Sequence, residues 1–265
     1  MQLHFIAIGG SAMHSLALAM HRLGHRVTGS DDAIFDPSKT KLEQANLLPD
    51  TLGWHPEKLN NEIDVVVLGM HAKADNPELI MAQALGLKIQ SYPEFLASMC
   101  KEKSTVVVAG SHGKTTITAM VLHVLNYHGV STDFMIGAPV PAVTETLSIS
   151  DENDFILLEG DEYLSSAIDS QPKFLWYKPE IALISGIAWD HINVFPTFED
   201  YISQFEKFIY SIVEGGVLFY NEEDKELKSL VENCSHPVKK IPYVTPEHTV
   251  DNGITYLNTS EGSLP

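Results

Sequence analysis

The sequence has little positive charge and little cysteine. Of its 265 residues, 17 are Lys or Arg and 35 are Asp or Glu, which gives a formal net charge of −18, and Arg22 and Arg26 are the only arginines. A duplex-binding protein needs a basic surface to displace counterions, so nucleic acid is not expected as a partner. Cys100 and Cys234 are too few for a disulfide framework and lack the C-x-x-C spacing of a zinc site. If a polyanionic ligand binds, backbone amides at helix N-termini must supply much of the attraction.

Long apolar runs are also missing. No run reaches the ~18–20 residues that a membrane-spanning helix needs, and the first ten residues lack the basic flank and cleavage site of a secretory signal. We therefore expect a cytoplasmic protein without a membrane partner. A monomer is a separate expectation, which these features do not decide. At roughly 100–200 residues per domain, the length fits two domains.

Short apolar runs recur along the chain and end in glycine or polar residues. They predict strands at 3–8, 25–31, 65–68, 105–109, 155–158, 181–184 and 217–220. Segments with helical periodicity separate several of them, such as 13–23 and 116–127. Continuous apolar strands alternating with helices indicate parallel sheets covered on both faces, so the expected fold class is α/β.

Two of the strands run directly into glycine-containing turns that open helices, near residues 9 and 110. This pattern predicts two sheets, in domains at 1–101 and 102–265. Beyond residue 220 we expect a helix at 222–232 and strands at 238–243 and 253–257. No helical segment follows to cover the last strand, so the second domain is expected to be incomplete.

The strongest local signal is T-V-V-V-A-G-S-H-G-K-T-T at 105–116. Its G-K-T ending is typical of a P-loop, in which loop amides surround phosphate, lysine neutralises the β/γ oxygens and the hydroxyl binds Mg²⁺. This assigns Lys114 to phosphate and Thr115 to the metal. Val108 stands where the first glycine of the pattern is usual, so the loop is a variant, and an ordinary strand-to-helix turn is the alternative.

A P-loop also needs an acid on a neighbouring strand. Glu159 follows four apolar residues and is expected at the C-terminal end of a strand, where α/β sheets place ligands, with Asp161 and Glu162 just beyond it. The next strand leads to Asp190 and His191 at the same edge, where the histidine is a candidate ligand of a second metal. The alternative is a set of solvated polar turns.

The N-terminal turn, A-I-G-G-S-A-M, follows a strand and opens a helix that we expect Ser11 to cap. A dinucleotide fingerprint G-x-G-x-x-G would need glycines where this chain has Ala7, Gly9 and Ala12, which disfavours an NAD-dependent oxidoreductase. Asp31 ends the next strand, about where an acid meets a ribose hydroxyl. A nucleotide diphosphate on this turn and a purely helix-packing role for its glycines both remain open.

Taken together and in order, these segments resemble the Mur ligase family, ATP-dependent amide-forming enzymes of peptidoglycan assembly. The resemblance rests on I-G-G-S-A-M at 8–13, T-G-S-D at 28–31, A-G-S-H-G-K-T-T at 109–116, and E-G-D-E at 159–162 followed by Asp190-His191. It implies a Rossmann-like N-terminal domain that holds a UDP-sugar and a P-loop-type α/β ATPase domain that holds ATP. The family continues with a G-x-H-N-x-x-N helix and a third domain. We therefore expect these 265 residues alone to bind the UDP-sugar, and ATP weakly, without ligating.

Within the family, the resemblance favours the branch that acts on UDP-N-acetylmuramate. The segments F-D-P-S at 35–38 and M-H-A-K-A-D-N-P-E at 70–78, together with Tyr163 and the segment 173–179, are similar to the recycling ligases. Those add the tripeptide L-alanyl-γ-D-glutamyl-meso-diaminopimelate. The alternatives are a ligase that adds L-alanine, and a nucleotide-sugar-binding protein without catalysis.

In the family reaction, the muramyl carboxylate attacks the γ-phosphorus of ATP, and the amine of the amino acid or peptide then takes up the acyl phosphate. The resemblance assigns catalysis to Lys114, Glu159 and His191. It places one Mg²⁺ on Thr115 and Glu159 and a second on Glu159 and His191. Lys207 lies one position from where some members carry a carbamylated lysine, so that role is not assigned. The resemblance assigns binding of the ATP phosphates to Gly110, Ser111, His112, Gly113, Lys114, Thr115 and Thr116. It assigns binding of the UDP-sugar to Gly9, Gly10, Ser11, Ala12, Met13, Asp31 and His71.

Overall fold

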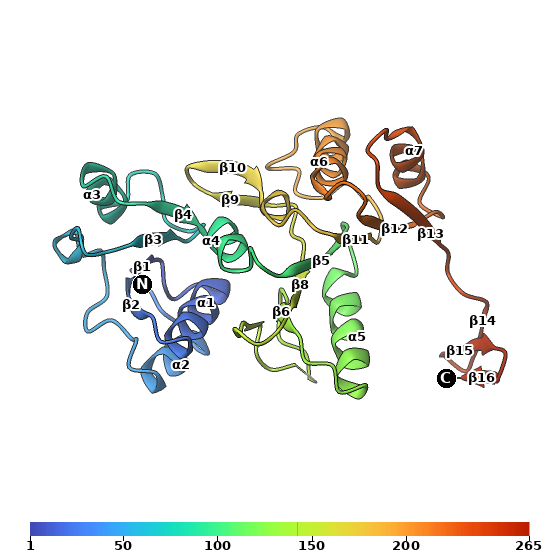
Figure 1. Cartoon of the computed structure of the whole chain (residues 1–265), viewed down its shortest axis with the longest axis horizontal. Helices are drawn as coiled ribbons and strands as arrows, with labels where there is room; N and C mark the ends of the chain where they lie inside the picture. The colour runs from blue at the N-terminus through green and yellow to red at the C-terminus, as the bar shows by residue number, and fades with distance from the viewer. Residues whose placement is uncertain (142, 265) are drawn as a thin grey trace.

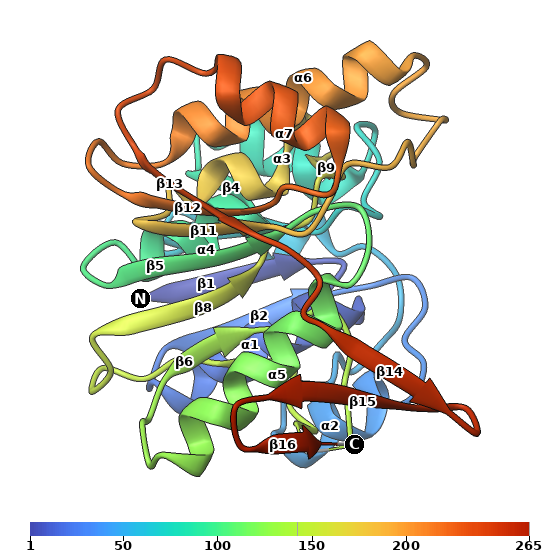
Figure 2. The ribbon, with the colours of Figure 1, turned by 90° about the vertical axis from the view of Figure 1, so that its right-hand side faces the viewer.

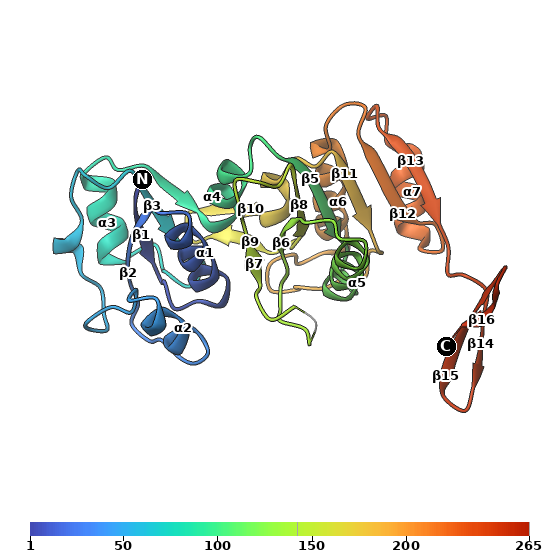
Figure 3. The ribbon, with the colours of Figure 1, turned by 60° about the horizontal axis from the view of Figure 1, so that its bottom comes forward.

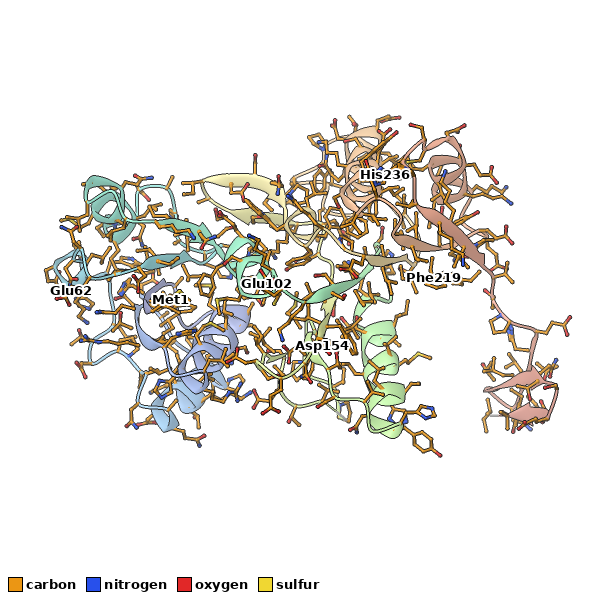
Figure 4. All side chains as sticks on the ribbon, viewed as in Figure 1. Met1, Glu62, Glu102, Asp154, Phe219 and His236 are labelled. Carbon is orange, nitrogen blue, oxygen red and sulfur yellow. The ribbon has the colours of Figure 1, made fainter. Side chains whose placement is uncertain are left out.

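The computed structural model describes residues 1–141 and 143–264, which form two α/β lobes and a small separate sheet (Figure 1). Met1 and Glu62 lie in the first lobe and Phe219 and His236 in the second, with Glu102 between the two (Figure 4). Each lobe has its own parallel sheet, and the expected α/β class is confirmed.

The first lobe is built on a four-stranded parallel sheet in the order β2-β1-β3-β4. Its strands are β1 (Gln2–Ile6), β2 (Arg26–Ser30), β3 (Val65–Leu68) and β4 (Ile89–Ser91). Its helices are α1 (Ser11–Arg22), α2 (Ser38–Gln44), the 3-10 turn η1 (Pro56–Lys58), α3 (Pro77–Ala84) and α4 (Tyr92–Met99). All four residues of β3 are buried, as expected for a strand covered on both faces.

Side-chain caps start two of these helices. Asn76 accepts the backbone N–H groups of Glu78 and Leu79 at the start of α3, and Ser91 with Glu94 forms a capping box on α4. The expected cap at Ser11 is wrong. Helix α1 begins at Ser11 itself, its N-cap residue is Gly10, and no side chain caps it, which leaves the first-turn amides available to a ligand.

The second lobe holds a seven-stranded sheet in the order β13-β12-β11-β5-β8-β6-β7, parallel except for the β6–β7 pair. Its strands are β5 (Ser104–Ala109), β6 (Asp133–Met135), β7 (Leu147–Ser148), β8 (Phe155–Glu159), β11 (Ile181–Ile184), β12 (Val217–Asn221) and β13 (Lys239–Tyr243). Because β8 and β11 flank β5, the segments that follow these three strands meet at one edge of the sheet.

Helices cover both faces of this sheet. In Figure 2, α6 (Phe198–Ser211) and α7 (Lys225–Asn233) lie on one face and α5 (Lys114–Tyr127) on the other. Helix α6 is amphipathic and buries Phe205 and Phe208 against Phe174, which lies in the 3-10 turn η2 (Lys173–Trp176). An antiparallel hairpin of β9 (Leu164–Ser166) and β10 (Asp169–Pro172) precedes η2. No helix of the described residues has both the length and the apolar character to cross a membrane.

The third sheet is antiparallel and contains β14 (His248–Asp251), β15 (Ile254–Thr259) and β16 (Gly262–Leu264). It lies apart from the seven-stranded sheet in Figures 1 and 3. The strand predicted at 253–257 is therefore part of β15, which pairs with β14 and β16 in this separate antiparallel sheet. Asn252 and Gly253 both have positive φ, and an Asn-Gly turn of this kind closes a two-residue hairpin.

Candidate active site

The turn between β5 and α5 has the shape of a phosphate-binding loop. Gly110 and Gly113 have φ of 126° and 80°, a region that favours glycine. A Cβ on Gly110 would come within 2.1 Å of the Ser185 hydroxyl, and the Ser111 amide donates to the carbonyl of Gly186 at 3.0 Å. The loop is thus held against the segment that follows β11.

Lys114 folds back over this loop. Its Nζ donates to the carbonyl of Gly110 at 2.7 Å and to Oε2 of Glu162 at 2.8 Å. The Glu162 side chain is fully buried, and that of Lys114 is 14% exposed. Of the other loop side chains, those of His112 and Thr116 are exposed, and that of Ser111 is buried.

Thr115 and Glu159 lie side by side, as the P-loop interpretation predicts. The Thr115 hydroxyl donates to Glu159 Oε1 at 2.8 Å, and the Gly137 amide donates to Oε2 at 2.7 Å. No group of three or more His, Cys, Asp or Glu side chains suited to a metal occurs in the described part of the chain. Mg²⁺ bound with a nucleotide needs only one or two protein oxygens, because phosphate and water complete its shell. The hydroxyl and carboxylate pair therefore fits one Mg²⁺.

His191 lies at the same edge but contacts a different carboxylate from the one expected. Its Nε2 is 3.6 Å from Oε1 of Glu162, and its ring packs edge-on against Tyr163 with centroids 4.9 Å apart. His191 and Glu159 are the pair expected to hold a second Mg²⁺. Within the described residues, these two side chains make no direct contact. Glu162, which His191 contacts, also accepts a hydrogen bond from Lys114.

Glu162 connects the site to α6, and sequence reasoning missed this link. Its Oε1 accepts the Tyr201 hydroxyl at 2.9 Å, and that hydroxyl lies 2.8 Å from the Ser111 hydroxyl. Burial raises the pKa of Tyr201, so the phenol stays protonated. Glu162 was visible beside Glu159 in the sequence. Tyr201 carried no signal that separates it from a core aromatic residue. Lys207, on the same helix, is exposed and bonds only to Gln204 among the described residues.

The N-terminal turn is tight despite its missing glycines. Ala7 has φ of 67°, the conformation that the first fingerprint glycine usually supplies. A Cβ on Gly9 would lie 2.8 Å from Ile34 and 2.9 Å from Asp31. Asp31 accepts the Gly9 amide at 2.7 Å and the Ala33 amide at 3.3 Å, and burial raises its pKa. The structure thus uses Asp31 to hold the turn.

One cavity of about 270 Å³ lies between the two lobes and is lined by residues of both. Of the residues assigned to the UDP-sugar, five line it and two, Gly9 and Asp31, support the turn behind it. From the second lobe, Glu159 and Lys173 reach the same cavity. The lining residues are Gly10, Ser11, Ala12, Met13, Met70, His71, Tyr92, Met135, Ile136, Gly137, Thr146, Glu159, Asp161, Ser165, Lys173 and Tyr177. The cavity therefore joins the free amides of α1 to the carboxylate beside the P-loop.

Comparisons with known proteins match both lobes. The profile of the Mur ligase family, catalytic domain, matches residues 2–104, and that of the Mur ligase middle domain matches residues 108–255. The UDP-N-acetylmuramate–L-alanine ligase of Streptococcus pneumoniae (strain Hungary19A-6) is 33% identical over 231 residues, which cover 87% of this chain and 48% of that protein. The chain thus spans about half the length of the curated relatives it matches.

Solved structures agree with the fold. The crystal structure of the UDP-N-acetylmuramate:L-alanyl-γ-D-glutamyl-meso-diaminopimelate ligase from Neisseria meningitides has a TM-score of 0.84 and 26% identity, covering 96% of this chain and 85% of that one. A murein peptide ligase from Psychrobacter arcticus 273-4 has a TM-score of 0.77 and 28% identity, covering 93% and 53%. Both overlap the two lobes described above.

Proposed function

Because the chain belongs to the Mur ligase family, we propose that its residues supply the UDP-sugar and ATP sites of an ATP-dependent carbon–nitrogen ligase. The observation that carries this proposal is the cavity between the lobes. It runs from the first-turn amides of α1 to Glu159, whose carboxylate contacts the P-loop hydroxyl of Thr115. We propose that residues 1–101 hold the UDP-sugar and residues 102–265 hold ATP.

The proposed reaction brings a carboxylate and a phosphate together, so its main demand is to neutralise two anions and align them. The backbone amides of Ser11, Ala12 and Met13 lie in the first turn of α1, where no side chain caps them, so they can donate hydrogen bonds to a diphosphate. Lys114 would exchange Glu162 for the β/γ oxygens of ATP. Mg²⁺, held by Thr115 and Glu159, would supply further positive charge at the γ-phosphate.

For the sugar acid we propose UDP-N-acetylmuramate, and for the incoming amine the tripeptide L-alanyl-γ-D-glutamyl-meso-diaminopimelate, in peptidoglycan recycling. The likeness to two peptide ligases supports the tripeptide. L-Alanine is the second candidate, and the 33% identity to an L-alanine ligase supports it. A cytoplasmic location, a monomeric state and the lack of membrane and nucleic-acid partners stay predictions.

Calorimetric titration of the purified chain tests the proposal. We expect it to bind UDP-N-acetylmuramate, and to bind ATP in the presence of Mg²⁺ through Lys114. A folded chain that binds neither ligand would contradict the proposal. Offering L-alanine and the tripeptide in competition to the full-length protein decides between the two amines, because the preferred one is incorporated into the UDP-sugar product.

A further inference from the structure

The part of the cavity nearest the second lobe carries an uneven set of charges. Glu159 and Asp161 contribute two carboxylates to the lining, and Lys173 contributes one ammonium group. Among the described residues that line the cavity, Lys173 is the only lysine or arginine. Lys114 is not a lining residue, because its Nζ is turned to Glu162 and the Gly110 carbonyl.

Lys173 is held in place by the segment that carries the acidic motif. Its amide donates to the carbonyl of Tyr163 at 2.9 Å, and the Phe174 amide donates to the carbonyl of Asp161 at 3.0 Å. The ammonium group lies 5.9 Å from the centre of the Tyr163 ring. The two amide hydrogen bonds fix the backbone at Lys173, and its side chain is 20% exposed.

The ammonium group of Lys173 has N–H donors that no protein acceptor uses among the described residues. Nζ donates to Asp161 Oδ2 at 2.6 Å, and within the described residues no second acceptor receives a hydrogen bond from it. The two side chains form a salt bridge, and the side chain of Asp161 is 38% exposed. A lysine has three N–H donors, which leaves two for a ligand in the cavity.

A ligand that places its diphosphate on the α1 amides reaches toward these charges with its sugar end. A carboxylate on the sugar would meet Glu159 and Asp161, which repel it, and Lys173, which attracts it. We propose that Lys173 is a specificity-determining residue: its ammonium group binds the carboxylate of the sugar acid, and Asp161 positions that group. This inference rests on the proposed function.

Two nucleotide sugars separate the role of Lys173 from binding in general. UDP-N-acetylmuramate carries a lactyl carboxylate, and UDP-N-acetylglucosamine is the same molecule without the lactyl group. We expect the wild-type chain to bind the first more tightly. Lys173→Met should weaken UDP-N-acetylmuramate about 10- to 100-fold, as expected for a lost charge-assisted hydrogen bond, and leave UDP-N-acetylglucosamine within about threefold.

Two further variants complete the calorimetric experiment, which needs neither ATP nor Mg²⁺. Lys173→Arg keeps the charge and should keep most of the preference for the sugar acid. Lys178→Met removes a lysine from the same segment that is exposed and does not line the cavity, and should bind both ligands as the wild type does.

The outcomes separate the two proposals. A wild-type chain that binds neither nucleotide sugar contradicts the proposed function. A wild-type chain that binds both equally, or a Lys173→Met variant that weakens both equally, overturns the role of Lys173 and leaves the proposed function standing. If Lys173→Met does not fold, Lys173→Arg decides: a loss of the preference with folding intact also overturns the role.

Discussion

A buried histidine–carboxylate pair supports the lobe that presents the N-terminal turn. His4 in β1 and Glu78 in α3 are 1% and 0% exposed, and His4 Nε2 lies 3.3 Å from Glu78 Oε2. The other ring nitrogen lies 2.9 Å from the hydroxyl of Thr28, which itself donates to the Leu3 carbonyl. The His4 ring thus lies between a buried carboxylate and a hydroxyl, each within hydrogen-bond distance of one ring nitrogen.

Replacing Glu78 with glutamine should lower the free energy of unfolding of this lobe. The carboxylate accepts from both His4 and the His55 amide, at 3.3 and 2.6 Å. A glutamine has one acceptor oxygen and one NH₂ group, so one buried donor loses its partner. Leaving a buried donor without its partner costs about 1–3 kcal/mol. At about 2–4 °C per kcal/mol, the midpoint of thermal unfolding should fall by roughly 2–12 °C.

Glu57→Gln is the matched control. Glu57 also contacts His55, at 3.2 Å, but its side chain is 69% exposed, so its loss should cost less than about 0.5 kcal/mol. Urea and thermal unfolding followed by circular dichroism measure both variants. If Glu78→Gln unfolds like Glu57→Gln, the assignment of the buried pair is wrong.

The acid dependence gives a second measurement of the same pair. Burial raises the pKa of Glu78, but the hydrogen bonds from His4 and His55 outweigh it and hold the pKa below its ordinary value. A lowered folded pKa adds stability above the unfolded pKa, near 4.3, and that stability is lost as pH falls through the folded pKa. The free energy of unfolding should thus fall less in Glu78→Gln than in the wild type over that acid range.

Three further predictions concern the site. Lys114→Ala should lower ATP binding at least 10-fold and leave UDP-N-acetylmuramate binding within about twofold, measured by calorimetry, because Lys114 does not line the inter-lobe cavity. Gly9→Ala should lower the free energy of unfolding by about 1–3 kcal/mol, since its Cβ would lie 2.8 Å from Ile34; an unchanged urea midpoint would contradict the tight turn. Tyr201→Phe should cost about 1–3 kcal/mol in urea unfolding, because Glu162 loses a buried donor.

The motifs were predictable because each depends on a short stretch of chain. The strands at 65–68 and 181–184 have the predicted bounds, and the P-loop follows β5 as expected. Parallel pairing then brings Glu159 next to Thr115, since β5 and β8 are neighbours. Local periodicity together with one rule of sheet topology is enough to reach this part of the site.

Other parts of the fold left too weak a local signal. Strand β6 has only three residues, and the β9–β10 hairpin pairs irregularly, so neither was predicted. Helix α6 was also missed, although Thr197 caps it by accepting the Asp200 amide. Because α6 supplies Tyr201, the missed helix is the reason that the link from Ser111 to Glu162 was not found.

The N-terminal turn shows how tertiary contacts override a pattern. Ala7 takes a positive φ without glycine's freedom, a conformation that costs of order 1 kcal/mol or more for a residue with a Cβ. The Ala7 amide donates to the Ser30 carbonyl at 2.9 Å, and Asp31 holds Gly9. Both partners come from the end of β2, so no local rule could weigh them. The lack of glycine at position 7 therefore breaks the G-x-G-x-x-G sequence pattern, but the chain still forms the tight turn that this pattern usually marks.

The inter-lobe cavity depends on contacts that no sequence rule describes. The hydroxyls of Ser15 in α1 and Thr146 before β7 lie 2.7 Å apart, which joins the first lobe to the second at a residue that lines the cavity. Ser15 sits one turn beyond Ser11 on the same helix, so this contact also fixes where the free amides of α1 point. The distance from the α1 amides to Lys173 therefore depends on contacts at the lobe interface, both this polar one and the apolar cluster that the two lobes share. A ligand that contacts both the α1 amides and Lys173 has an affinity that depends on how the lobes are joined. Affinity for the sugar acid is therefore a more sensitive measure of this site than affinity for UDP.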